Sequence, residues 1–267
     1  MKKSNLIIKN GLIIILIMHI CWSQIEQTYP PLYLVSIPTA GTLPRGTYTI
    51  EALLSKNGGF TPKLSVGFTD NFSFGVSFGV QKLIGNDSLY FNKTTPEVQI
   101  KYRVFDESQS MPALVYGLDT QGRGTYTNTV ITDSVPSFNR YEQKAWGMYL
   151  VLSKNWSFLG NLGLHGGICK SITENDDGDE DLNIFGGIDK ELNRSFSFLI
   201  DYDAALNDNN YKFNDISFGK GKGYLNAGIR WAVSSNLMME INFNDISKNT
   251  DAEYTNREIK IMYSESF

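Results

Sequence analysis

Few side chains in this sequence belong to the types that carry catalysis. Beyond the first 23 residues there is one histidine, His165, and one cysteine, Cys169. A serine hydrolase would need an oriented serine and a carboxylate beside His165. The letters Gly-x-Ser-x-Gly occur at residues 75–79, but they lie within an alternating apolar pattern typical of a strand and not at a strand-to-helix elbow, so they do not mark a nucleophile. One imidazole and one thiol are also too few ligands for a zinc site. We therefore predict no catalytic residue, no metal site and no cofactor, with a hydrolase centred on His165 as a less favoured alternative.

The densest group of charges is acidic and runs from Glu174 to Asp181. Carboxylate oxygens are the ligands that Ca²⁺ and Mg²⁺ prefer, so this stretch could bind a divalent cation. Its spacing differs from that of an EF-hand, because Ile184 stands where the bidentate glutamate belongs. We favour a solvated loop and keep a cation bridge to lipopolysaccharide phosphates as the alternative.

Other charged residues recur at alternate positions within otherwise apolar stretches. If the stretches are strands, eight of these residues would lie on a polar face that lines a lumen: Lys63, Glu97, Lys101, Arg103, Asp201, Asp203, Arg230 and Glu240. An unpaired charge in a confined space is costly, so we expect Lys101 and Arg103 to pair with carboxylates of this set. The candidate partners are Asp201, Asp203 and Glu240.

The stretches that carry these charges have the period of β-strands. Apolar residues occupy every second position from Phe72 to Val80, with only serine and glycine between them. A strict period of two excludes a helix, and residues 97–104 repeat it with charges on the polar face. Further alternating stretches are 48–54, 196–203, 225–231 and 237–243, and weaker ones are 112–119, 145–153, 161–170 and 182–189.

The connections between these stretches alternate in length. Short turns are expected near residues 70, 107, 154, 194 and 235, and longer polar loops near 57, 86, 128, 177, 210 and 250. These alternating connections join twelve strands and leave both ends on the short-turn side. That layout is typical of outer-membrane β-barrels. We predict an all-β fold: an antiparallel, up-and-down transmembrane β-barrel of about twelve strands over residues 47–267.

Aromatic residues cluster where such a barrel would meet the membrane surface, as in the aromatic girdles of outer-membrane barrels. Eight of them lie close to a short turn or to the C-terminus: Phe68, Phe72, Phe105, Trp156, Phe158, Phe196, Trp231 and Phe267. The last expected strand ends in phenylalanine, which is similar to the signal read by the barrel assembly machinery. Period two further predicts which residues face lipid, namely Phe74, Ile100, Phe198 and Ile229, and which face inward, namely Ser73, Lys101, Asp201 and Arg230.

Residues 1–23 have the features of a cleaved signal peptide. Three lysines precede an apolar run at residues 12–20, and a cleavage site follows at residues 21–23. A lipidated Cys21 is the alternative. Removal of this peptide leaves 21 basic and 28 acidic residues, a net charge of −7, which is unsuited to nucleic acid. Residues 24–46 contain four prolines, so we expect an irregular periplasmic leader or a small plug that reaches into the barrel.

A motif before the first expected strand resembles a known family. The run IPTAGTLPRGT at residues 37–47 leads on to NGG at 57–59 and LSVGFTDNF at 64–72. Over about residues 33–80 the chain is similar to the YjbH-like family of outer-membrane barrel proteins, which are associated with exopolysaccharide production. The resemblance implies a barrel fold and a link to exopolysaccharide, and it implies no catalytic residue.

These patterns favour a non-enzymatic protein of the bacterial outer membrane, exported through a cleaved signal peptide, that passes or exports a polar solute. Exopolysaccharide is a candidate solute. The alternative is a structural or adhesive envelope protein with a closed lumen and ligand-binding extracellular loops, and an outer-membrane hydrolase is the least favoured. Expected partners are outer-membrane lipid, lipopolysaccharide, the barrel assembly machinery and, for export, polysaccharide; nucleic acid is not expected.

Overall fold

The structure is a computed structural model of the whole chain that describes residues 31–84, 88–129, 138–209, 219–250 and 254–267. The predicted signal peptide lies outside the described residues. In the part that is described, no helix is long and apolar enough to cross a membrane.

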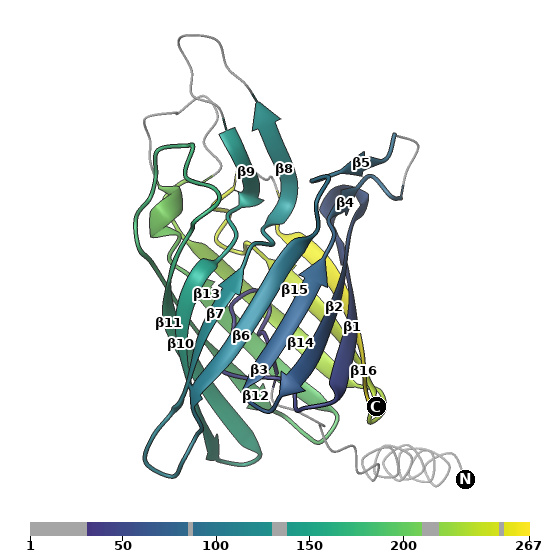
Figure 1. Cartoon of the computed structure of the whole chain (residues 1–267), viewed down its shortest axis with the longest axis vertical. Helices are drawn as coiled ribbons and strands as arrows, with labels where there is room; N and C mark the ends of the chain where they lie inside the picture. The colour runs from purple at the N-terminus through teal and green to yellow at the C-terminus, as the bar shows by residue number, and fades with distance from the viewer. Residues whose placement is uncertain (1–30, 85–87, 130–137, 210–218, 251–253) are drawn as a thin grey trace, which may run out of the picture.

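Within the described ranges, twelve strands form one closed ring (Figure 1). They are β1 (Thr47–Ser55), β2 (Gly59–Thr69), β3 (Phe72–Ser77), β6 (Glu97–Phe105), β7 (Ala113–Asp119), β10 (Gly147–Ser157), β11 (Asn161–Lys170), β12 (Asn183–Glu191), β13 (Phe196–Asp203), β14 (Tyr224–Ala232), β15 (Leu237–Asn244) and β16 (Asn256–Ser266). Each strand is antiparallel to its neighbours, and β1 closes the ring by pairing with both β2 and β16. The predicted fold is therefore confirmed: an antiparallel barrel of twelve strands.

Exposure alternates along the strands of the ring. In β3, Ser73, Gly75 and Ser77 are buried, whereas the residues between them are partly exposed. The outer surface carries a broad band of exposed apolar side chains that includes Ile50, Leu64, Tyr116, Leu150, Leu152, Leu164, Ile184, Ile229, Ile241, Phe243 and Ile259. A soluble monomer rarely exposes so large an apolar surface, whereas a barrel in lipid requires one. The predicted facing of Phe198 and Ile229 outward and of Ser73 inward agrees with this exposure.

The connections differ from the prediction in three places. The loop expected near residue 57 is only the short 3-10 turn η1 (Lys56–Gly58), because Asn57 and Gly58 both adopt positive φ, as a tight hairpin requires. Lys154 lies within β10, so the turn that follows this strand comes at residues 158–160. The loops near 86 and 128 contain strands of their own, β4 (Val80–Gln81) with β5 (Tyr90–Phe91) and β8 (Arg123–Thr129) with β9 (Phe138–Gln143).

Aromatic rings gather at the end of the barrel that carries the short turns, here called the turn end. Phe196 and Trp231 stack with their ring centroids 5.9 Å apart, and Phe68 lies 6.0 Å from Phe72. The C-terminal Phe267 is exposed and lies 6.3 Å from Tyr48. The opposite end, here called the loop end, carries the β4–β5 and β8–β9 hairpins (Figure 1).

The chain before β1 does not run outside the ring. Residues 31–46, here called the inner segment, lie within the ring of strands, where Figure 1 shows their purple trace. Leu34, Val35, Ile37 and Leu43 are fully buried. The described part of the predicted leader therefore contacts the inner wall of the barrel.

Candidate functional site

The inner segment is bound to the barrel wall through its own backbone. Four successive carbonyl oxygens each accept a hydrogen bond from a different cationic side chain. Leu32 bonds to Lys101, Tyr33 to Arg230 at 2.8 Å, Leu34 to Lys260 at 3.4 Å and Val35 to Arg123. Lys101 also donates to the carbonyl oxygens of Thr39 at 3.1 Å and Gly41 at 3.3 Å. The wall thus recognises a row of oxygen atoms.

The backbone N–H groups of the segment meet acceptors on another part of the wall. Asp201 of β13 accepts from the Ser36 amide at 2.9 Å and from the Ser36 hydroxyl at 3.0 Å. Asn226 of β14 donates to both Asp201, at 2.7 Å, and the Ser36 hydroxyl, at 2.9 Å. Because Asp201 is almost fully buried, its charge is stabilised by these donors and not by water.

Tyr33 is the side chain of the segment with the most polar contacts. Its hydroxyl donates to Asp119 of β7 at 2.9 Å. The ammonium groups of Lys63 and Lys101 lie 4.2 and 4.5 Å from the centre of its ring, a cation–π arrangement. One aromatic ring therefore occupies the space between two lysines that no carboxylate contacts among the described residues.

The remaining wall is apolar, which the alternation pattern did not reveal. Leu34, Val35, Ile37 and Ala40 pack against inward-facing residues of β7, β10, β11, β12 and β13, which are Ala113, Val115, Tyr149, Val151, Cys169, Phe185 and Leu199. Leu32 and Leu43 form a second cluster with Met238 and Met262. Burying each aliphatic side chain contributes about 1.5–3 kcal/mol, so the segment is held by packing as well as by hydrogen bonds.

A glycine on β2 makes room for the segment where it leaves the lumen. A Cβ atom at Gly67 would lie 2.1 Å from the carbonyl oxygen of Pro44 and 2.7 Å from that of Leu43. Any other residue at this position would therefore push against the backbone of the segment. Gly186 of β12 faces outward, and a Cβ atom there would meet no atom closer than 3.5 Å.

The eight residues predicted to line a lumen are all at least partly buried. Glu97, Lys101, Asp201, Arg230 and Glu240 are buried, and Lys63, Arg103 and Asp203 are partly buried. Asp203 accepts from the Asn183 amide at 2.6 Å, and Glu97 accepts from the Tyr141 hydroxyl at 3.0 Å and pairs with Lys93 at 2.5 Å. Lining of an open lumen stays a prediction.

The predicted pairing of Lys101 and Arg103 with carboxylates across the lumen is wrong. Lys101 bonds to carbonyls of the inner segment, and Arg103 pairs at 3.0 Å with Asp106, three residues along the chain. The physical reason is that the segment lies between the strands and supplies the acceptors itself. Glu240 instead bonds to its neighbours in the sheet, Arg230 on β14 and Lys260 on β16, each at 2.6 Å.

His165 is part of a hydrogen-bonded chain that the sequence reasoning did not find. Its Nδ1 lies 2.7 Å from the Ser153 hydroxyl, and its Nε2 lies 2.7 Å from an Asp189 carboxylate oxygen. The backbone N–H of Ala40 donates to the same hydroxyl at 2.8 Å. Period two could place all three residues on the inner face, but the register of three strands decides that they meet. Because the backbone N–H of Ala40 donates to the Ser153 hydroxyl, the hydrogen-bonded Ser153, His165 and Asp189 side chains help to position the inner segment.

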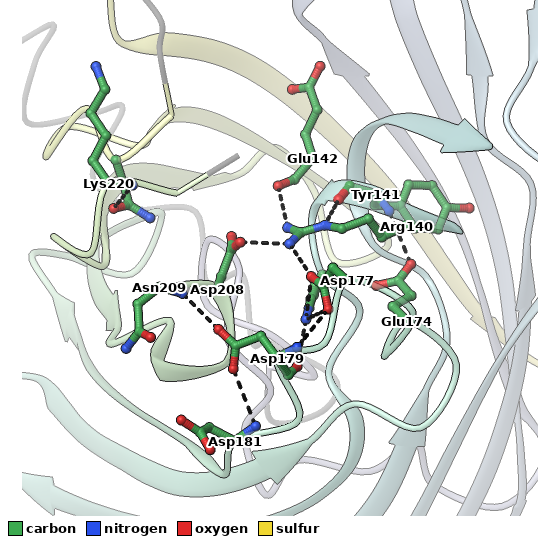
Figure 2. A network of polar contacts seen from close by, with 12 residues as sticks. Arg140, Tyr141, Glu142, Glu174, Asp177, Asp179, Asp181, Asp208, Asn209 and Lys220 are labelled. Atoms are coloured by element: carbon green, nitrogen blue, oxygen red, sulfur yellow. Dashed lines mark hydrogen bonds and ion pairs between the residues drawn. The ribbon is translucent and has the colours of Figure 1, made fainter. Parts of the chain in front are cut away.

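Ion pairs join the connections at the loop end to one another (Figure 2). Arg140 of β9 bonds to Asp177 at 2.8 Å and to Asp208 at 2.7 Å, and Lys144 bonds to Asp177 at 2.7 Å. Burial lowers the pKa of Arg140, but the two aspartates outweigh this effect and raise it. Two separate loops are thereby tied to the β8–β9 hairpin. The acidic stretch is therefore partly neutralised by basic side chains, and within the described residues its carboxylates form no cluster suited to a metal ion.

Glu174 belongs to the same network of polar contacts at the loop end. Its two oxygens accept from the backbone amides of Tyr141 at 3.2 Å and Ala145 at 2.7 Å. Burial raises the pKa of Glu174 to about 7, although these hydrogen bonds and the charge of Arg140 lower it. Its protonation should therefore change near neutral pH.

A cavity of about 80 Å³ remains between the inner segment and the loop end. Aromatic and charged side chains line it, among them Tyr33, Trp146, Tyr224, Lys63, Asp119 and Glu258. One water position takes about 10–15 Å³ of such a volume, so the cavity has room for several water molecules. The inner segment and the side chains packed against it occupy much of the space that the described strands enclose.

A closed antiparallel ring with an apolar outer band and a largely polar interior defines a β-barrel of the outer-membrane type. Solved outer-membrane proteins have a similar fold. The KdgM porin in complex with disordered oligogalacturonate has a TM-score of 0.49 at 12% identity, over 83% of this chain and 99% of that one. The NanC porin has a TM-score of 0.43 at 9% identity, over 82% of this chain and 99% of that one. Omp33 of Acinetobacter baumannii has a TM-score of 0.43 at 8% identity, over 83% and 97%.

No family model matches the chain, and no relative was found among curated proteins. The comparisons therefore concern the barrel fold alone, and the resemblance to the YjbH-like family is supported only as far as an outer-membrane barrel.

Proposed function

We propose that this chain forms a non-enzymatic outer-membrane channel for polar solutes, and that the inner segment closes the channel from within. The observation that carries this proposal is the bonding of four successive carbonyls, at residues 32–35, to cations on four different strands. A wall that satisfies a polypeptide backbone so completely would hold water and polar solutes if the segment moved aside. Twelve strands enclose a narrower lumen than the sixteen of a general porin.

The small cavity supports the closing role of the segment. The cavity of about 80 Å³ has room for several water molecules, so passage of a larger solute through the barrel requires the segment to be displaced. The link to exopolysaccharide stays a prediction that depends on the resemblance of residues 33–80. A structural or adhesive role with a permanently closed lumen is the alternative.

Two variants test the proposal in planar bilayers. Gly67→Ala should push residues 43–44 out of place, because its Cβ would overlap the Pro44 carbonyl. Asp201→Asn removes a charged acceptor from the Ser36 contacts, without touching the four cations. Both variants should show frequent openings in a protein that is otherwise closed for most of the time.

Gly186→Ala is the matched control, because the added methyl group faces outward with ordinary clearance. It should behave as the native protein. If both lumen variants are as silent as this control while circular dichroism shows intact strands, the channel proposal is wrong and the closed-lumen alternative is favoured.

A further inference from the structure

The four cations that bond to the carbonyls of residues 32–35 form few direct ion pairs with the wall. Arg230 and Lys260 share one carboxylate, that of Glu240. Arg123 pairs with Glu258. Lys101 has only backbone carbonyls as its hydrogen-bond acceptors in the described part of the chain. Three of the four cations thus share two carboxylates, Lys101 bonds to none, and carbonyl oxygens of the segment complete the coordination of all four.

The wall carboxylates that contact the segment have other partners to retain. Asp201 keeps its hydrogen bond from Asn226 at 2.7 Å. Asp119 keeps those from the Gln99 side chain at 3.2 Å and from the Gln121 amide at 2.9 Å. Displacement of the segment would therefore leave Asp119 with two donors, whereas Asp201 would lose its contacts with Ser36 and Ile37 and keep the one from Asn226.

The cations would lose more than these carboxylates. Lys101 would lose all three of its acceptors, and Arg230, Lys260 and Arg123 would each lose one. Unsatisfied buried donors are costly and bind acceptors strongly. Glu51 is another carboxylate near this wall, and it lies opposite Lys63 in the register of β1 and β2.

We propose that Lys101, Arg123, Arg230 and Lys260 form a binding track for an anionic, oxygen-rich solute, and that the carbonyls of residues 32–35 occupy this track in the closed state. This inference depends on the proposed channel and names its substrate class, solutes that carry carboxylate or phosphate groups. It replaces the expectation from the sequence that oppositely charged residues pair across the lumen, which would suit neutral or zwitterionic solutes.

The ion selectivity of the Gly67→Ala channel tests whether the four cations form a binding track. In a tenfold potassium chloride gradient, the reversal potential should show a preference for chloride. Citrate should reduce the current, whereas the neutral sugar sucrose at the same concentration should not. Anionic preference follows because the open wall offers four cationic donors with few anionic partners.

Single substitutions in the Gly67→Ala background test which cations bind the anion. Lys101→Gln and Arg123→Gln should each weaken block by citrate about tenfold, the loss expected for one charged hydrogen bond. Lys170→Gln is the matched control, because Lys170 lies exposed on the outer face of β11. Arg123 is in a hairpin outside the ring, so its replacement leaves the barrel strands intact if Lys101→Gln does not fold.

The two proposals fail in different ways. Currents without chloride preference and without block by citrate would overturn the track while the channel stands. Silence of both Gly67→Ala and Asp201→Asn, with intact strands, would overturn the channel and the track together.

Discussion

Glu240 should be the most sensitive buried carboxylate of the barrel. Its side chain is fully buried on β15 between Arg230 and Lys260, and each of its oxygens accepts one charged hydrogen bond of 2.6 Å. In Glu240→Gln, the neutral amide keeps one acceptor oxygen but presents its NH₂ group to the second cation. Two like charges then face each other without a counter-ion.

The expected loss of stability is about 3–5 kcal/mol, the range for removing one partner from a buried ion pair. A surface ion pair would change stability by no more than about 1 kcal/mol, so the two cases are well separated. Unfolding in detergent micelles by urea, followed by tryptophan fluorescence, gives the free energy from the midpoint and slope. The slope should not change, because the same surface is exposed on unfolding.

Two further variants show whether the reasoning is right. Glu265→Gln removes an exposed carboxylate near the C-terminus and should change stability by less than about 0.5 kcal/mol. In a Lys260→Met background, Glu240→Gln should cost less, because one uncompensated cation is gone. A loss below about 1 kcal/mol for Glu240→Gln, at unchanged slope, would refute the claim that this triad is dry and tightly coupled.

Three other predictions concern the outer wall, the loop end and the serine chain. Phe74→Arg places a charge on the lipid face and should cost about 2–4 kcal/mol in a lipid-refolding assay, whereas equal stability would contradict the facing of β3. The raised pKa of Glu174, about 7 against 4.5 in the unfolded chain, means that its loop contacts are most stable at acidic pH and weaken as pH rises through 7. Hydrogen exchange of the Ala145 amide, corrected for intrinsic rate, should show this loss, and Glu174→Gln should abolish it. Ser153 should not react with a fluorophosphonate in the native protein, because its hydroxyl is buried under Ala40; labelling that His165→Ala abolishes would instead support a hydrolase.

The sequence carries a local signal for the short connection between β1 and β2. Asn57-Gly58 is a strong signal for a tight hairpin, because both residues tolerate positive φ, and residues 56–58 form such a turn between β1 and β2. The pattern of polar residues around it suggested a long loop instead. Local backbone chemistry was the better guide at this position.

The contacts of the inner segment had no comparable signal. Its hydrogen bonds from the four cations join residues that are 60 to 226 positions apart in the chain. The position of Lys101 in the sequence does not indicate whether its ammonium group bonds to a backbone carbonyl or to a carboxylate. The apolar inner wall around Leu199 was not predicted either. Alternation shows which face of a strand a residue lies on, but not whether the surroundings of that face are polar or apolar.

The amino-acid sequence by itself determined the strands, their faces and the closed barrel, because alternation along a strand is a local property with a period of two. Only the tertiary structure decided what lies inside. The inner segment, the Glu240 triad and the Ser153–His165–Asp189 chain arise where separate strands curve into one ring, and their contacts depend on register and closure. Those quantities follow from the packing of the whole barrel, and no stretch of sequence carries them alone.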